Sequence, residues 1–131
     1  MTCIIAEAGI NHNGSLDMAI QLIRKASEAK VDVVKFQTGK PERVISQQAP
    51  KAEYQIRTTG KEESQLEMLK NIELSQKDHF SLKKICKEYN LEFLSSPFDL
   101  ESVTFLSDEL KVSRIKIYSY SRHTRRQWTI T

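Results

Sequence analysis

The sequence predicts an α/β fold made of successive parallel β-α-β units, and three observations support this prediction. Short runs of apolar, often β-branched residues alternate with longer segments whose apolar residues recur at helical spacing. Residues that favour helix N-termini stand where those longer segments should begin. The chain of 131 residues has the length of one ordinary domain and shows no internal repeat. Strands that alternate with helices in one domain form a parallel sheet with right-handed crossovers.

The first third of the chain contains two predicted strands and one predicted helix. Residues 3–6 are an apolar run typical of a buried strand. Ser15 is a suitable N-cap for an amphipathic helix over residues 16–29, where apolar side chains recur every three or four positions. Residues 31–38 are rich in β-branched residues and predict the second strand. A long connection without a clear period follows, over residues 39–59.

The remainder contains two more predicted strands. A capping-box pattern beginning at Ser64 predicts a short helix, and a similar pattern beginning at Ser75 predicts a longer one that ends near residue 90. Residues 91–98 are the third predicted strand, followed by a helix capped by Asp99. Residues 114–117 are the fourth predicted strand. The sequence therefore predicts about four parallel β-α units.

The charge distribution argues against nucleic-acid binding. The formal net charge is +3, from 20 basic and 17 acidic residues, and Arg122, Arg125 and Arg126 account for the whole excess. Residues 1–117 are therefore neutral and present no basic surface for a phosphate backbone. Three arginines on a neutral body would give only weak, salt-sensitive contact with nucleic acid.

The sequence also predicts a cytoplasmic protein that does not cross a membrane. No apolar run approaches the roughly 20 residues that a membrane-spanning helix needs. The N-terminus lacks the pattern of a secretion signal. Cys3 falls in an expected strand and Cys86 on the apolar face of an expected helix, so we expect both to be reduced core residues.

Polar side chains follow each predicted strand at the point where the strand ends. They are Glu7, then Lys35 and Gln37, then Ser95 and Ser96, then Lys116. Because the carboxyl ends of parallel strands meet at one edge of a sheet, where ligands of α/β folds bind, these side chains should share one charged pocket. Two lysines and hydroxyl groups suit an anion such as a phosphate or carboxylate. A carboxylate suits sugar hydroxyls or proton transfer.

Each of these residues also has an alternative interpretation. Lys35 at a strand end often forms only a structural ion pair, here with Glu7. His12 stabilises its turn or faces a ligand, and the sequence leaves these two interpretations equal. Ser96 before Pro97 suits turn chemistry. His79, near a predicted helix start, is expected to be exposed.

Four segments in order resemble the N-terminal part of bacterial N-acetylneuraminate (sialic acid) synthases. They read IIAEAGINHNG, VDVVKFQT, APKAEYQIRTTGKEESQLEML and EFLSSPFDLESVTFL, and the resemblance extends from Ile4 to Ile117. It implies a (β/α)8 TIM barrel. Residues 1–117 would then form its N-terminal half, a partial synthase domain, because a complete barrel needs about 250 residues.

The resemblance also implies an activity. Members of that family condense phosphoenolpyruvate with N-acetylmannosamine, release phosphate, use a divalent metal (manganese or magnesium), and work as homodimers. It implies that Lys35 and Lys116 hold the charges of phosphoenolpyruvate, with Ser64, Ser96 and Ser119 at neighbouring binding positions. Glu7 and Gln37 would face the amino sugar, within reach of the loop that contains Asn11, His12 and Asn13. The metal ligands of the family lie in later strands, so none is expected in this chain.

The resemblance also implies catalytic roles for three of these residues. We expect Glu7 to orient the sugar, and Lys35 and Lys116 to stabilise negative charge as phosphate departs. A bound metal would polarise the acceptor aldehyde as a Lewis acid. Related synthases that make legionaminic or pseudaminic acid are close alternatives, because they differ in the sugar pocket.

Residues 118–131 depart from the resemblance. In the family a Ser-Gly-Glu turn follows the fourth strand, whereas here Tyr120 and Ser121 follow Ser119 and the segment becomes basic. These features favour a shifted reading frame and an early stop, a hypothesis that the coding DNA tests. The sequence therefore predicts a truncated, inactive form of the synthase. The other hypothesis is a non-catalytic fragment that binds a partner through its open half-barrel edges.

Overall fold

The computed structural model describes residues 1–44 and 65–117. Strands and helices alternate in this part of the chain, as the sequence predicts. In order they are β1 (Ile5–Gly9), α1 (Leu16–Glu28), β2 (Val33–Thr38), α2 (Pro41–Val44), α4 (Gln65–Asn71), α5 (Gln76–Glu88), β3 (Glu92–Pro97), α6 (Leu100–Thr104) and a π-helical turn, η1 (Phe105–Glu109). The predicted strand over residues 3–6 begins and ends later than expected. Apart from the predicted fourth strand, the other predicted elements agree within about two residues.

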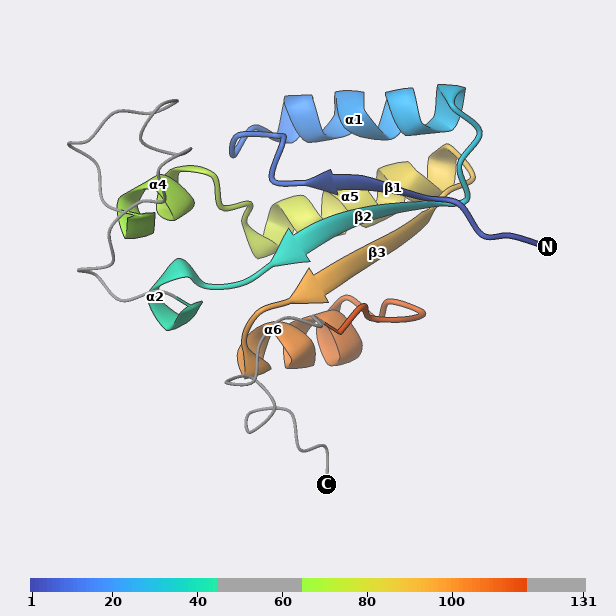
Figure 1. Ribbon diagram of the computed structural model, residues 1–131. Coiled ribbons are helices and arrows are strands. Elements are labelled where there is room, and N and C mark those ends of the chain that lie inside the picture. The colour runs from blue at the N-terminus through green and yellow to red at the C-terminus, as the bar shows by residue number, and fades with distance from the viewer. Residues whose placement is uncertain (45–64, 118–131) are drawn as a thin grey trace.

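The three strands form one parallel sheet in the order β1-β2-β3 (Figure 1). Glu7 is the register partner of Lys35 across β1 and β2, and Gln37 is the register partner of Ser96 across β2 and β3. A register shift follows Glu7, so that Gly9 lies opposite Phe36. All three strands point the same way, and their carboxyl ends therefore lie at one edge of the sheet.

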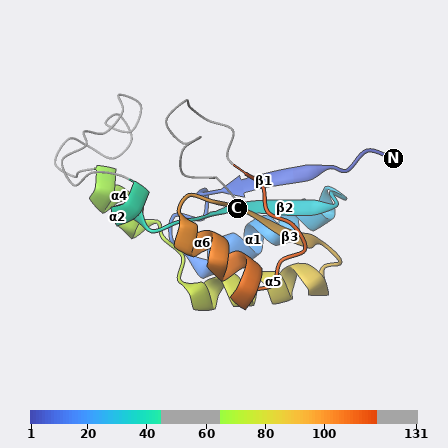
Figure 2. The same cartoon turned by 90° about the horizontal axis from the view of Figure 1, so that it is seen from below.

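One face of the sheet is covered by helices, and the hydrophobic core lies between the two layers. α1, α5 and α6 lie on the same side of the strands (Figure 2). Strand residues of alternate positions enter this core, where they meet fully buried side chains of α1, α5 and η1; the core includes Val34, Phe36, Phe93, Ala19, Ile23, Leu82, Cys86, Phe105 and Leu106. Since side chains alternate across a strand, Glu7, Lys35, Gln37 and Ser96 belong to the opposite face.

The helix N-termini form where the sequence predicts them. The Ser15 hydroxyl accepts a hydrogen bond from the Met18 amide and caps α1. Ser75 and Asp78 form a reciprocal capping box at α5, and Asp99 caps α6 by accepting from the Ser102 amide. These caps satisfy amide groups that have no partner within their own helix.

The predicted fourth strand is wrong. Among the described residues, 114–117 form no strand, and the segment is joined to β3 by a backbone hydrogen bond from the Lys116 amide to the Ser95 carbonyl, at 3.1 Å. The Arg114 guanidinium instead forms two 2.8 Å hydrogen bonds to the Glu92 carboxylate at the start of β3. One backbone hydrogen bond does not make the repeating ladder that a strand requires.

Two further expectations are wrong, and two elements were not expected. His79 is buried, not exposed, and Cys3 is exposed, not part of the core, because it precedes β1. α2 forms within the connection that showed no period, and η1 continues α6. Among the described residues, no helix is both long and apolar enough to cross a membrane.

Candidate functional site

The centre of the candidate site is an ion pair on the uncovered face of the sheet. Lys35 Nζ lies 2.5 Å from Glu7 Oε2 and 3.5 Å from the Ser96 hydroxyl. The Lys35 side chain is 16% exposed, whereas that of Glu7 is 48% exposed. An ammonium group that is mostly removed from water needs a partner, and here it has one carboxylate and one weakly placed hydroxyl. The structure therefore brings together three of the predicted site residues.

Gln37 continues the same face toward the carboxyl end of the sheet. Its register partner is Ser96, and its side-chain amide and the Glu7 carboxylate both approach Gly9. A Cβ atom at Gly9 would lie 3.1 Å from Glu7 Oε1 and 3.7 Å from Gln37 Nε2, and the residue has a φ of +54°. Glycine at this position thus allows the strand to bend while two polar side chains pass beside it.

The loop after β1 is organised by His12. The His12 ring is buried, its Nδ1 accepts a 3.0 Å hydrogen bond from the Gly14 amide, and a hydrogen bond also joins the ring to the Gly9 backbone. Burial lowers the pKa of His12, and the nearby His79 lowers it further. Since both ends of the loop bind this ring, the structure supports the turn-stabilising interpretation of His12. Asn11 and Asn13 are exposed, and Asn13 has a φ of +49°.

The structure describes one of the three remaining predicted site residues. The Lys116 amide binds the Ser95 carbonyl, which brings this residue next to β3, and its side chain is exposed. Ser64 and Ser119 lie outside the described residues. The role of Lys116 as a second cation for phosphoenolpyruvate stays a prediction.

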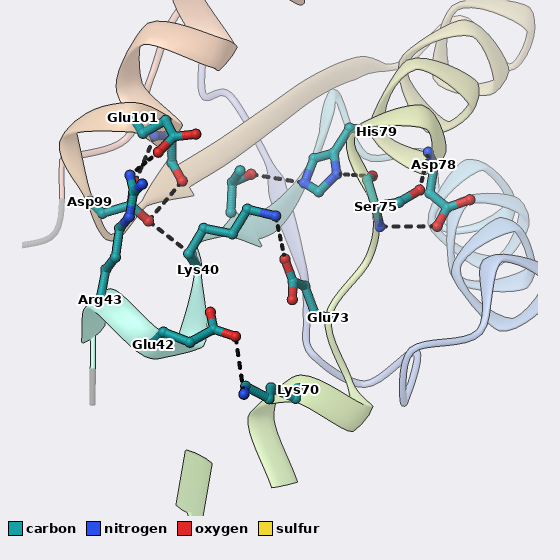
Figure 3. A network of polar contacts seen from close by, with 12 residues as sticks. Lys40, Glu42, Arg43, Lys70, Glu73, Ser75, Asp78, His79, Asp99 and Glu101 are labelled. Carbon is teal, nitrogen blue, oxygen red and sulfur yellow. Dashed lines mark hydrogen bonds and ion pairs between the residues drawn. The ribbon is translucent and has the colours of Figure 1, made fainter. Parts of the chain in front are cut away.

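A polar network that the sequence analysis missed joins the loops at the carboxyl ends of β2 and β3 (Figure 3). The Asp99 carboxylate accepts from the Lys40 amide at 2.8 Å while it caps α6. Arg43 forms ion pairs with Glu101 and, at 4.0 Å, with Asp99. Asp99 was predicted only as a helix cap, and its link to Lys40 spans 59 residues of sequence, which no local pattern indicates.

The same network continues to the helices that follow β2. Lys40 Nζ lies 3.0 Å from Glu73 Oε1, and Lys70 Nζ lies 3.2 Å from Glu42 Oε1 (Figure 3). The second pair joins α2 to α4, which also pack against each other. Most of these charges are partly exposed, so each pair contributes little stability by itself. Their common effect is to fix where the chain leaves β2.

A cavity of about 190 Å³ lies behind these loops. Its walls are mainly apolar. They come from the loops after β1, β2 and β3, from α4 and the segment after it, and from α5, α6 and η1; they include Ile10, Pro41, Leu69, Ile72, Phe98 and Phe105. His12, Thr38 and His79 contribute polar groups, and Gln37 borders both this cavity and the uncovered sheet face. The site thus consists of a charged face and an apolar space that share Gln37.

The described residues do not fit a metal site. Among residues 1–44 and 65–117, no three His, Cys, Asp or Glu side chains gather closely enough to hold an ion. The Glu7 carboxylate pairs with Lys35, and His12 and His79 use their ring nitrogens in hydrogen bonds with neighbouring groups. We therefore derive no chemical step through a metal.

Comparison with known protein families identifies the chain. The family model described as the NeuB family matches residues 22–126. The chain belongs to the NeuB family. This membership confirms the resemblance to sialic acid synthases that the four sequence segments indicate.

Two similar relatives are named as synthases. The chain is 50% identical over 115 residues to N,N'-diacetyllegionaminic acid synthase of Campylobacter jejuni, and 46% identical over 120 residues to the protein of the same name from Legionella pneumophila. These matches cover 87% and 91% of this chain, but 34% and 33% of the two relatives. The chain thus spans about a third of the length of the relatives that it matches.

Solved structures agree with the fold. The N-acetylneuraminic acid synthetase of Leptospira borgpetersenii, solved with citrate, has a TM-score of 0.71 and 28% identity, over 88% of this chain and 36% of its own. The spore coat polysaccharide biosynthesis protein of Bacillus subtilis has a TM-score of 0.64 and 33% identity, over 90% of this chain and 29% of its own. The prediction of part of a TIM barrel is confirmed.

Proposed function

We propose that this chain carries the phosphoenolpyruvate-binding part of a synthase that condenses phosphoenolpyruvate with N-acetylmannosamine and releases phosphate. The observation that carries the proposal is the Glu7–Lys35–Ser96 group on the uncovered face of the sheet. Membership of a family of sugar-acid synthases supports it. Because the chain spans about a third of its relatives, the complete reaction is proposed for the whole protein.

The chemistry assigned to each residue follows from its place in the sheet. Lys35 offers a fixed positive charge to the carboxylate or phosphate of the ligand, and the Ser96 hydroxyl offers a neighbouring hydrogen bond. Glu7 is the more exposed partner, so its carboxylate is the group that can turn away from Lys35 toward sugar hydroxyls. Without a ligand, the Glu7 carboxylate pairs with Lys35. In this proposal a bound anionic ligand replaces part of that pairing.

A second acceptor is favoured by sequence similarity. Two relatives, at 50% and 46% identity, bear the name N,N'-diacetyllegionaminic acid synthase. An acceptor sugar with two acetamido groups is therefore the alternative substrate. The reaction class and the role of Lys35 are the same for both acceptors.

Ligand binding by the 131-residue chain tests the proposal. Phosphoenolpyruvate is titrated into the ¹⁵N-labelled chain, and amide shifts around Lys35 and Ser96 are followed. We expect saturable shifts. Lys35→Met should lower the affinity for phosphoenolpyruvate by about tenfold or more, since one charge-assisted contact is lost. Lys84→Met is the matched control, because Lys84 is an exposed residue of α5. Equal affinity in both variants would contradict the proposed role of Lys35.

Turnover is the second test. Phosphate release is measured with phosphoenolpyruvate, N-acetylmannosamine and manganese, and then with a diacetamido sugar as acceptor. Release that depends on the sugar and disappears in Glu7→Gln shows that this chain catalyses the reaction. Binding without release supports the prediction of an inactive form.

The proposal also includes a cytoplasmic location and a homodimer. The two free cysteines, Cys3 and Cys86, agree with a reducing compartment.

A further inference from the structure

A chain of buried polar groups lies on the helix-covered side of the sheet, directly behind the candidate site. The Ser95 hydroxyl is 2.7 Å from the Thr38 hydroxyl, which is 2.9 Å from His79 Nε2. His79 Nδ1 is in turn 2.7 Å from the Ser75 carbonyl at the start of α5. Ser95, Thr38 and His79 are all buried. Three polar side chains in an apolar core need a reason to be there, because each costs free energy unless it is hydrogen-bonded.

The Ser75 carbonyl determines which of these polar groups donate and which accept. A carbonyl oxygen only accepts, so His79 Nδ1 must carry the hydrogen toward Ser75. Burial lowers the pKa of His79 and outweighs the smaller opposing effects of the Ser75 and Gln37 backbone, Asp78 and Glu73, so the ring is neutral. Nε2 of the neutral ring therefore accepts from the Thr38 hydroxyl. The Thr38 oxygen is then left to accept from Ser95.

These hydrogen bonds connect the carboxyl ends of β2 and β3, which carry the site. Thr38 directly follows Gln37, and Ser95 directly precedes Ser96. Gln37 and Ser96 are register partners that face the other side of the sheet. A backbone hydrogen bond of 2.9 Å from the Phe98 amide to the Thr38 carbonyl closes the same corner. A movement of Thr38 against Ser95 would therefore move Gln37 against Ser96.

We propose that His79 is a positioning residue, which acts through Thr38 and Ser95 to hold Gln37 and Ser96 in place for the ligand. Its acceptor nitrogen orients the Thr38 hydroxyl, and the helix start at Ser75 holds the ring. The part of this inference that concerns ligand binding rests on the proposed function. The part that concerns the geometry of Gln37 and Ser96 does not.

The test uses the 131-residue chain and three variants. Thr38→Val removes the hydroxyl that links His79 to Ser95, and Thr38→Ser restores it. Thr104→Val is the matched control, because the Thr104 hydroxyl only donates to the Leu100 carbonyl within α6, where it is exposed. The measurements are the ¹⁵N shifts of the His79 ring, the side-chain amide signal of Gln37, the backbone signal of Ser96, and the affinity for phosphoenolpyruvate.

We expect the wild-type ring to carry its hydrogen on Nδ1. In Thr38→Val we expect displaced Gln37 and Ser96 signals and an affinity about tenfold weaker, with recovery in Thr38→Ser. A merely structural polar core would lower stability in Thr38→Val but leave the Gln37 and Ser96 signals and the affinity unchanged. That result, or a ring with its hydrogen on Nε2, would overturn the inference.

Two other outcomes also have a defined meaning. If the wild-type chain does not bind phosphoenolpyruvate, the proposed function fails, and the Gln37 and Ser96 signals alone decide the positioning role. If Thr38→Val does not fold, Ser95→Ala removes only the last hydroxyl and gives the same readout. Undisturbed Gln37 and Ser96 signals in folded Ser95→Ala would contradict the inference.

Discussion

The Lys35 ammonium group lies 2.5 Å from the Glu7 carboxylate, and the two residues are register partners in neighbouring parallel strands. The register shift that follows Glu7 lets β1 bend away at Gly9. Lys35 is mostly buried and Glu7 is half exposed. Removal of Glu7 would therefore leave a mostly buried ammonium group without a partner, whereas removal of Lys35 would leave a carboxylate that water still contacts.

The first prediction concerns the stability of this pair. Glu7→Gln leaves the Lys35 ammonium group without a carboxylate, and we expect the free energy of unfolding to fall by about 1–2 kcal/mol. The double variant Glu7→Gln/Lys35→Met should recover most of that loss, since no unpaired charge remains. Urea denaturation gives both values. Glu28→Gln is the control, because its pair with Lys25 is well exposed and should contribute less than about 0.5 kcal/mol. Equal losses in Glu7→Gln and Glu28→Gln would contradict the prediction.

The second prediction concerns acid stability. Burial lowers the pKa values of His12 and His79 in the folded state, whereas unfolded histidines titrate near the ordinary value of 6.5. The unfolded state therefore binds more protons as the pH falls below about 6.5, and stability should decrease there. Each histidine contributes a slope of up to about 1.4 kcal/mol per pH unit, until the pH reaches its folded pKa.

Denaturation midpoints in urea between pH 8 and pH 5 measure this effect. We expect a plateau above about pH 7 and a decline below it. The imidazole shifts of the two rings, followed by NMR over the same range, assign the decline to His12 and His79. A stability that stays level down to pH 5 would contradict the lowered pKa values.

The elements that could be predicted are those whose cause is local in sequence. Ser15, Ser75 and Asp99 cap helices through contacts with residues three positions away. The capping-box spacing predicts Ser75, and the residue type at an expected helix start predicts Ser15 and Asp99. The polar residues at strand ends were also predictable, because parallel strands bring their carboxyl ends to one edge. The Glu7–Lys35 pair was one of two interpretations that the sequence left open.

What could not be predicted depends on distant partners. His79 stands at a helix start, which suggests exposure, but the stacking of α5 on β2 and β3 buries it against Thr38. Residues 114–117 have the composition of a strand, yet they meet β3 through the Lys116 amide and the Arg114 side chain. Asp99 meets Lys40 because β2 and β3 pair and bring their ends together. In each case tertiary contacts override the local pattern.

The third prediction concerns the capping box of α5. Ser75→Ala removes the oxygen that accepts from the Asp78 amide at 3.0 Å, and we expect a loss of about 1 kcal/mol. Ser81→Ala in the same helix is the control, because its hydroxyl only donates to the Lys77 carbonyl and should be nearly neutral. Thermal and urea denaturation give the comparison. The Ser75 carbonyl, which accepts from His79 Nδ1, is kept in Ser75→Ala, so the ring should keep its hydrogen on Nδ1. Losses of equal size in the two variants would contradict the assigned role of the cap.

The fourth prediction concerns Gly14, at the start of α1. Its φ is +76°, and an added Cβ atom would lie 2.4 Å from the Asn71 carbonyl oxygen. Gly14→Ala should therefore destabilise the protein by about 2 kcal/mol or more, from backbone strain and from a clash with the segment after α4. Asn13→Gly is the matched control, because Asn13 also has a positive φ and the change adds no atoms; it should shift stability by less than about 0.5 kcal/mol. A neutral Gly14→Ala would show that the loop and the end of α4 can separate freely.

The fifth prediction separates the two thiols. Cys86 is fully buried on α5, and burial raises the pKa of its thiol to about 12, so almost no thiolate exists at pH 8. Cys3 is exposed ahead of β1, where its sulfur lies 3.7 Å from the Arg114 guanidinium. A thiol reagent such as 5,5'-dithiobis-(2-nitrobenzoic acid) should therefore label Cys3 quickly and Cys86 only as the protein opens. Cys3→Ser should abolish the fast phase, and urea should make Cys86 react at the rate of an exposed thiol. Two fast thiols in the folded wild-type chain would show that α5 does not stay packed on the sheet.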